Sequence, residues 1–500
     1  MLRIDEIRLH PGEDESILPE RAAARLHLPV GALNHFRIVR RSVDARKEVS
    51  LVYSVQLQVR GEEKVLRHCR DKHISKAVRT RYTPSTASYS GAHRPVIVGA
   101  GPAGLFCALA LSRAGAQPIL LERGAPVEQR REDVVFFWKT GLLSPASNVQ
   151  FGEGGAGTFS DGKLNTLVKD ASGRNREVLR LLVEFGADPS ILYLNKPHIG
   201  TDVLSQVVKA IRTEILRLGG QVCFHTQLVS LEPVPGKEGL LSLGLRDTLS
   251  GETKSEMTQA LILAVGHSAR DTFEMLCSRG IPMEAKAFAV GLRIQHPQSM
   301  INRSQYGQDE VEELGAADYK VTWKASSGRG VYSFCMCPGG YVVDASSEPG
   351  RLAVNGMSYH GRAGENANSA LIVTVTPEDF PDRTALGGMH FQRQLEERAY
   401  ALGGGKIPVQ LYGDFRENRA GAENFGQVNP QFKGGYAFAN LRELWPEELS
   451  KALIEGVEAF EGMIRGFSRP DAILAGIESR TSSPVRIPRD EGLESPVRGI

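Results

Sequence analysis

The sequence lacks the features that mark secreted, membrane-spanning and zinc-binding proteins. Only six cysteines occur in 500 residues, with no CxxC pairs and no secretory context, so neither a disulfide framework nor a metal site is predicted. No apolar stretch approaches the ~20 residues of a membrane-spanning helix. The N-terminus has neither the apolar core of a signal peptide nor an Arg/Ser-rich transit pattern. We therefore expect a cytoplasmic chain with reduced thiols and no membrane partner.

The chain also has little net charge, but the charge is unevenly distributed. A total of +2 argues against a nucleic-acid-binding protein as a whole. Residues 1–90 carry 17 Lys and Arg against 11 Asp and Glu, or +6, which leaves 43 against 47, or −4, for the remainder. The densest basic cluster comprises Arg37, Arg40, Arg41, Arg46 and Lys47. It could contact RNA or an acidic partner, although one neighbouring aromatic, Phe36, is a small stacking platform.

The apolar pattern predicts a mixed α/β protein with several domains. A helix over 18–28 and a half-buried strand over 49–59 indicate a small basic α+β domain over 1–90. Strands and helices alternate over 94–285, which indicates a Rossmann-like dinucleotide-binding domain. A mixed pattern over 286–470 predicts an inserted α+β substrate or cap domain. Residues 471–500 are expected to return to the dinucleotide-binding domain.

The most specific motif is Gly99-Ala100-Gly101-Pro102-Ala103-Gly104, a GxGxxG between a buried strand and a helix. Gly99 permits the tight turn, Gly101 lets the backbone approach a pyrophosphate, and Gly104 lets the helix pack on the strand. Glu122 ends the next strand, where its carboxylate can accept hydrogen bonds from an adenosine ribose. A glycine-rich turn without a ligand is the alternative, but the strand, helix and acid in register favour a dinucleotide site.

Two further segments extend this prediction. Residues 148–164 are rich in glycine, and their amides and bare Cα atoms suit close approach to a flavin ring. A flexible loop is the alternative for this stretch. Residues 258–267 form a buried strand that ends in a turn of small residues, and an ordinary core strand fits this pattern equally well.

Together these segments resemble the glutathione-reductase-type FAD fold. More closely, the chain resembles the bacterial and plastid family of FAD-dependent dehydrogenases, also called NAD(P)/FAD-dependent oxidoreductases, over residues 41–46, 151–164, 196–202, 266–272 and 478–484. The resemblance implies FAD as the cofactor. It implies a FAD site at Gly99 to Gly104, Glu122, Arg123, Gly154, Gly155, Gly157, Thr158, Ser160, Asp161, Gly162, Leu228 beside the adenine, Ala264, Val265 and Gly266. Val265 departs from the family signature, which has Thr there.

The C-terminal end differs from that family. Its FAD fold closes over the flavin phosphates with a Gly-Asp/Glu-Gly element and a final helix. Residues 491–500 resemble only the approach to this element. We therefore expect a C-terminally truncated sequence that holds FAD poorly.

A bound flavin transfers hydride or electrons itself, so no particular catalytic side chain is required. His198 and His267 border glycine turns and could act as general acids or hydrogen-bond the ring, or could be loop histidines that satisfy backbone groups. Cys335 and Cys337 would share one face of a strand and could point at a pocket, or could be buried structural thiols. Arg480, Arg486 and Arg489 could bind an anionic substrate or lie on the surface.

The sequence thus predicts an FAD-dependent oxidoreductase with a small-molecule substrate. We expect NAD(P)H to be a transient reductant, because the sequence has no second strong GxGxxG. A flavin-dependent RNA-modifying enzyme that uses residues 1–90 is an alternative, and a non-catalytic FAD-binding protein is another. The sequence indicates no oligomeric state.

Overall fold

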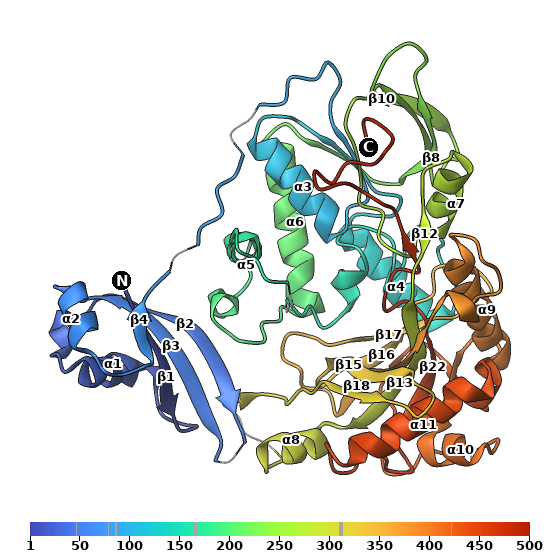
Figure 1. Cartoon of the computed structure of the whole chain (residues 1–500). Helices are drawn as coiled ribbons and strands as arrows, with labels where there is room; N and C mark the ends of the chain where they lie inside the picture. The colour runs from blue at the N-terminus through green and yellow to red at the C-terminus, as the bar shows by residue number, and fades with distance from the viewer. Residues whose placement is uncertain are drawn as a thin grey trace. The chain divides into compact units, whose positions relative to one another are not determined.

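The chain folds into two compact units, as seen in a computed structural model that describes all residues except 47, 79, 86–87, 165, 167, 310–313 and 422 (Figure 1). The first unit comprises Met1–Pro84, Lys163–Ile199 and Asn302–Ala317, and the second comprises Ser85–Gly162, Gly200–Ile301 and Asp318–Ile500. The first unit thus adds two later segments to the N-terminal residues. Lys47 of the basic cluster lies outside the described residues.

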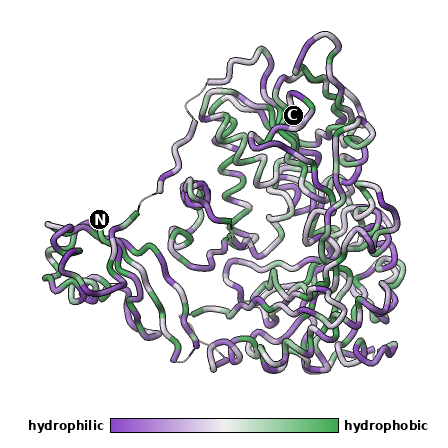
Figure 2. Tube along the Cα trace, in the orientation of Figure 1, coloured by the Kyte–Doolittle hydropathy of each residue, from purple (hydrophilic) through white to green (hydrophobic). Residues whose placement is uncertain are grey.

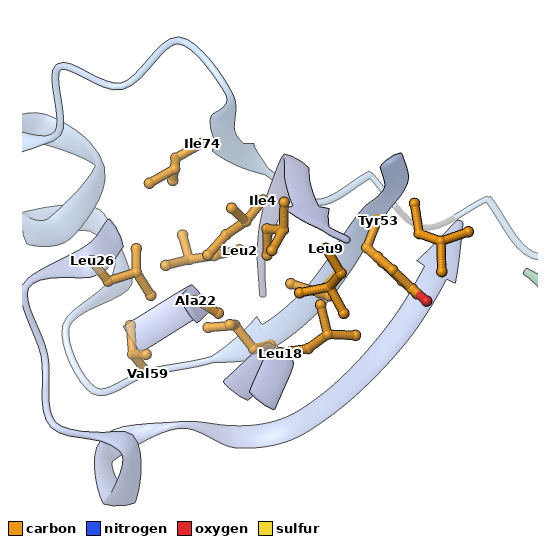
Figure 3. Packing of buried hydrophobic residues seen from close by; sticks show 13 residues of the cluster. Leu2, Ile4, Leu9, Leu18, Ala22, Leu26, Tyr53, Val59 and Ile74 are labelled. Atoms are coloured by element: carbon orange, nitrogen blue, oxygen red, sulfur yellow. The ribbon is translucent and has the colours of Figure 1, made fainter. Parts of the chain in front are cut away.

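The first unit contains a four-stranded antiparallel sheet of order β2-β3-β1-β4. The helices and strands of this unit are β1 (Leu2–Leu9), α1 (Leu18–Leu26), β2 (Asn34–Asp44), β3 (Ser50–Gln58), α2 (Glu62–His68), β4 (Ile74–Lys76) and α5 (Arg174–Glu184). Figure 3 shows the core of this sheet, in which Leu18 and Ala22 of α1 pack with Leu2 and Ile4 of β1. The helix predicted over 18–28 is therefore confirmed.

Strand β3 corrects one expectation, because it is buried on both faces rather than on one. It is an interior strand between β2 and β1. Its polar face is covered by arginines of these neighbours. Arg37 donates to Gln56 at 2.5 Å and Arg8 donates to Ser50 at 2.9 Å. Long arginine stems can cover a sheet face while their charged ends reach polar partners, which alternation along one strand does not reveal.

The second unit begins with a parallel sheet of order β11-β5-β6-β7. The strands of this sheet are β5 (Val96–Val98), β6 (Ile119–Leu121), β7 (Gln221–Cys223) and β11 (Leu261–Leu263), and the helices between them are α3 (Pro102–Arg113), α4 (Val127–Thr140) and α6 (Thr201–Arg217). Helices α3 and α6 pack side by side (Figure 1). The central βαβ unit and this strand order are those of a Rossmann-like sheet. An antiparallel sheet of β8 (Thr226–Pro233), β9 (Leu241–Asp247) and β10 (Thr253–Thr258) follows, and then α7 (Arg270–Ser278).

The rest of the second unit is built on a seven-stranded sheet of order β14-β15-β18-β13-β22-β19-β21. These strands are β13 (Phe288–Pro297), β14 (Val321–Lys324), β15 (Gly330–Cys337), β18 (Asn366–Val375), β19 (Ile407–Leu411), β21 (Tyr436–Phe438) and β22 (Ile473–Glu478). A three-stranded sheet contains β16 (Tyr341–Asp344), β17 (Val354–Met357) and β20 (Phe432–Lys433). A ladder joins β12 (Glu284–Ala285) to β23 (Val485–Arg486), and the helices are α9 (Gly387–Leu402), α10 (Tyr412–Glu417) and α11 (Glu447–Glu461). Helix α8 (Gln298–Tyr306) begins in the second unit and ends in the first.

The predicted mixed α/β class is confirmed. The inserted substrate domain and the domain boundaries stay predictions. Among the described helices, none combines the length and the apolar character that crossing a bilayer requires. Figure 2 agrees, since short hydrophobic and hydrophilic stretches alternate along the tube.

Three buried charges join α7, α9 and the segment after β22. Glu396 of α9 is fully buried and accepts paired hydrogen bonds from Arg270 and Arg480 at 2.7–2.9 Å. Burial opposes the ionisation of Glu396, but the two guanidinium groups hold the pKa of its carboxyl well below the usual range. Because each charge has a partner, this cluster fixes α9 against α7 and against the chain that leaves β22.

We expect Glu396→Gln to lower the free energy of unfolding at pH 7 by about 3 kcal/mol, because an amide cannot compensate two buried guanidinium groups. The folded-state pKa of Glu396 is depressed, so its contribution is present above the pKa of an unfolded carboxyl and is lost as the pH falls below it. The difference between variant and wild type should therefore shrink in acid. Denaturant unfolding at several pH values measures it.

Glu397→Gln is the matched control, because Glu397 is exposed and pairs with Arg351 at the surface. Equal losses of stability in the two variants would contradict the role assigned to Glu396.

Candidate cofactor-binding site

A cavity of about 1580 Å³ lies in the second unit. This volume exceeds the ~300–1,000 Å³ of most small-molecule sites, so a dinucleotide and part of a second molecule can fit. Its wall is assembled from segments that are distant in the sequence. They are the turn after β5, residues 121–123, 150–152 and 155–157, 226–228, 259–269, 272–273, Lys286, and much of 483–500.

The turn between β5 and α3 forms one side of the cavity. Gly99 has a φ of +103°, and a Cβ atom at this position would collide with the carbonyl oxygen of Ala264. At Gly104 a Cβ would collide with the carbonyl oxygen of Gly99. At Gly101, by contrast, the nearest atom to such a Cβ would be the Cα of Gly155 at 3.9 Å. Gly99 and Gly104 are therefore required by the fold, whereas Gly101 keeps open the space in front of α3.

Glu122 ties this turn to the glycine-rich loop. One of its oxygens, Oε2, accepts a hydrogen bond from the amide N–H of Ala100 at 2.9 Å. The other, Oε1, accepts the amides of Gly124 and Gly152, both at 3.0 Å. An ionised carboxylate offers about four acceptor positions. Three are used by the backbone, and one remains on the buried carboxylate at the wall of the cavity.

Arg130 shapes the glycine-rich loop from the opposite side. It lies in α4, is fully buried, and donates only to backbone carbonyls in the hydrogen bonds found for it. These acceptors are the carbonyl oxygens of Asn148, Val149, Gly152, Glu153 and Gly155, at 2.6–3.2 Å. Gly152 has a φ of +115°, and a Cβ there would collide with the Arg130 side chain. Burial lowers the pKa of Arg130 to about 10, which leaves it charged at neutral pH.

Arg123 lies beside Glu122 on the cavity wall and is held in place by Asp271, Phe151 and the Thr272 hydroxyl. Its guanidinium pairs with both oxygens of Asp271, at 2.9 and 3.0 Å, and lies 4.4 Å from the centre of the Phe151 ring. Burial opposes ionisation of Asp271, yet Arg123 holds the pKa of this carboxyl below its ordinary value. The charge of Arg123 is thus already matched within the protein.

Of the predicted cofactor-binding residues, the cavity wall contains Gly99, Gly101, Pro102, Ala103, Glu122, Arg123, Gly155, Gly157, Leu228, Ala264, Val265 and Gly266. The remaining ones, Ala100, Gly104, Gly154, Thr158, Ser160, Asp161 and Gly162, are not among its lining residues. Several of these support the loop instead: the Ser160 hydroxyl donates to the Gly157 carbonyl at 2.7 Å, and Asp161 pairs with Arg362 at 2.9 Å.

The two candidate histidines occupy different units. His267 lines the cavity, and within the described part of the chain its buried Nε2 has no hydrogen-bond partner. Burial and the adjacent Arg480 lower the pKa of His267 to about 4. His198 lies in the first unit, where its backbone forms an isolated bridge with Lys163. It is not a lining residue of this cavity.

The expectation that Cys335 and Cys337 share one face is wrong. A bulge interrupts the pairing of β15 with β18 between Phe334 and Cys337, and Cys335 has a φ of +53°. The period of two is therefore lost, so Cys335 is exposed while Cys337 is buried. Neither thiol lines the cavity.

Sequence reasoning also missed several residues of the site. Arg130 and Lys286 stand outside every motif, and only the fold shows that one supports the glycine loop and the other reaches the cavity. Arg480, taken as a possible anion-binding or surface residue, is instead buried against Glu396. Ser268, next to His267, could have been found from the matched stretch 266–272, and its hydroxyl donates to Gln150 at 2.9 Å.

We expect Gly101→Ala to fold normally and to lose FAD, because the added methyl group meets no protein atom closer than 3.9 Å but enters the space where the pyrophosphate would lie. Gly104→Ala should lose both FAD and stability, since its methyl group would collide with the Gly99 carbonyl. Flavin content after reconstitution and thermal unfolding separate the two effects. A Gly101→Ala protein that retains FAD as tightly as wild type would show that the cofactor does not approach this turn.

Comparisons with known proteins identify the family of the chain. Residues 287–481 match the family model described as "FAD-dependent protein, C-terminal domain-like", and residues 1–60 match a domain of unknown function. An uncharacterized protein of Clostridium beijerinckii is 47% identical over 501 residues, which cover 99% of this chain and 92% of the relative.

Solved structures give a weaker likeness. Thermovibrio ammonificans THI4 is 19% identical with a TM-score of 0.27, and the match covers 39% of this chain and 66% of that one. A flavoprotein/dehydrogenase from Cytophaga hutchinsonii is 10% identical with a TM-score of 0.29, and the match covers 57% of this chain and 56% of that one. The chain thus spans less than two thirds of either structure. The identity to the Clostridium protein and the match over 287–481 are far more specific: this chain belongs to their family of FAD-dependent proteins, and its cofactor is FAD.

Proposed function

We propose that the protein is an FAD-dependent oxidoreductase that transfers hydride or electrons between FAD and a nicotinamide cofactor or small organic substrate. The observation that carries this proposal is the glycine-lined cavity beside the N-terminus of α3, in a chain whose family is FAD-dependent. When bound, FAD supplies the acceptor and donor of hydride. The protein's residues bind and orient the reactants.

The residues present fit FAD. The first amides of a helix have no carbonyl partner within that helix, so the start of α3 around Ala103 and Gly104 can donate to the pyrophosphate. The free acceptor position of Glu122 suits a ribose hydroxyl. Leu228 offers an apolar wall for the adenine, and Gly155 and Gly157 let a flat ring lie against the backbone.

His267 acts in this proposal as a neutral hydrogen-bonding group. Burial lowers the pKa of His267 to about 4, so its imidazole is largely neutral at pH 7. A general acid needs its proton at the working pH, so the second role predicted for this residue, hydrogen bonding to the flavin or to a reactant, is the better supported one. The two thiols are not used, because neither lines the cavity wall.

The N-terminal unit does not favour the RNA-modifying alternative. Arg37 of its basic cluster donates to the uncharged Gln56, and two arginines of the cluster form ion pairs in the unit, Arg46 with Asp44 and Arg41 with Glu15. Cations in such pairs attract phosphate less than free ones. RNA binding and the cytoplasmic location stay predictions from the sequence.

We expect the flavin of the FAD-loaded protein to lose its visible absorbance when a nicotinamide nucleotide is added under anaerobic conditions. The titration is carried out separately with NADH and NADPH. His267→Gln should still be reduced, with a changed rate and no new pH dependence near neutrality. Bound flavin that neither nucleotide nor a panel of small organic substrates reduces would contradict the proposal and identify a non-catalytic FAD-binding protein.

A further inference from the structure

The cavity wall contains a group of cations on and just beyond the ladder between β12 and β23. Glu284 pairs with Arg486 and Ala285 with Val485 in an antiparallel register, and the Lys286 amide donates to the Pro484 carbonyl. Side chains alternate along strands, so Lys286 and Arg486 lie on one face of the ladder, diagonally across from each other. The opposite face holds Val485, which is buried. Arg489 follows three residues later and also lines the cavity.

These cations have little compensating charge within the protein. Among the described residues, the side chains of Lys286 and Arg489 form none of the ion pairs found. Arg486 has a single distant pairing, with its Nη1 4.0 Å from Glu284, and both side chains are exposed. Positive charges on a cavity wall with few carboxylate partners favour an anionic ligand.

The other cations of the wall differ from this group because their charge is matched. Arg123 forms its pair with Asp271, and Arg498 pairs with Glu238. The wall contains five cationic side chains in all and two acidic ones, Glu122 and Glu494, of which Glu122 is bound to three backbone amides. The excess of positive charge is thus concentrated at Lys286, Arg486 and Arg489.

The pyrophosphate of FAD does not need these cations, because the start of α3 provides amides and a helix dipole for it. We propose that Lys286, Arg486 and Arg489 form a second anion site, which binds a phosphate monoester on the molecule that exchanges electrons with FAD. This inference rests on the proposed function, since it describes the second reactant of the same cavity.

A phosphate monoester suits this site better than a single carboxylate. It carries a charge of about −1.5 to −2 and three acceptor oxygens, and the site offers one ammonium and two guanidinium groups. Guanidinium groups bind phosphate with two parallel hydrogen bonds, whereas an ammonium acts as a compact charge. Of the two nicotinamide nucleotides, NADPH carries such a group on its ribose and NADH does not.

The test compares NADP⁺ and NAD⁺ binding to the FAD-loaded wild type and to Lys286→Gln/Arg489→Gln. We expect NADP⁺ to bind wild type about tenfold or more tightly than NAD⁺, and this preference to vanish in the variant, because each lost charged hydrogen bond weakens binding by about tenfold. NAD⁺ affinity should stay unchanged. Lys324→Gln is the matched control, since Lys324 is an exposed lysine of β14 outside the cavity wall.

FAD content and thermal unfolding of each protein complete the experiment. Equal affinities for the two nucleotides in wild type would overturn the anion site. Loss of FAD from a folded Lys286→Gln/Arg489→Gln variant would also overturn it, because the cations would then serve the FAD phosphates. The proposed oxidoreductase function fails separately, if the bound flavin is not reduced by any reactant.

Discussion

The cavity depends on two buried charges that hold one glycine-rich loop between them. The carboxylate of Glu122 accepts hydrogen bonds from amides of both the turn after β5 and the loop. The guanidinium of Arg130 donates hydrogen bonds to five loop carbonyls. A loop of this composition has large conformational freedom and would be costly to order. Here the charges replace the hydrogen bonds that a helix or strand would provide. Glycine at 152 follows from this arrangement, because any side chain there would displace Arg130.

A second set of buried charges brings distant parts of the sequence to the same cavity. Glu396 holds Arg270 of α7 and Arg480, and only three residues after Arg480 the chain enters the cavity wall at Ser483. Anchoring Arg480 therefore positions the strand that carries Val485 and Arg486. Buried ion pairs contribute little net stability compared with apolar packing, but breaking one is costly. Their effect in this protein is to define where the C-terminal segment lies.

The sequence was sufficient for the parts of the site that depend on local backbone geometry. The turn at Gly99 to Gly104 could be predicted because its glycine spacing lies between a buried strand and a helix, and at Gly104 the required contact, with the Gly99 carbonyl, is local. Contacts across long sequence distances could not be predicted. Lys286 reaches the cavity only because β12 pairs with a strand 200 residues later, a contact that no periodicity encodes. The faces of Cys335 and Cys337 were mispredicted because a bulge shifts the alternation by one residue.

The guanidinium of Arg130, buried in α4, shapes the glycine-rich loop from outside the cavity wall, and we propose that this loop binds FAD. The dissociation constant of FAD in Arg130→Met, compared with Arg131→Met, tests it most directly, because Arg131 is the exposed neighbour on the same helix. We expect Arg130→Met to weaken FAD binding by about a hundredfold, since several loop carbonyls lose their donor, and Arg131→Met to bind FAD like wild type. Equal FAD affinity in a folded Arg130→Met protein would contradict it.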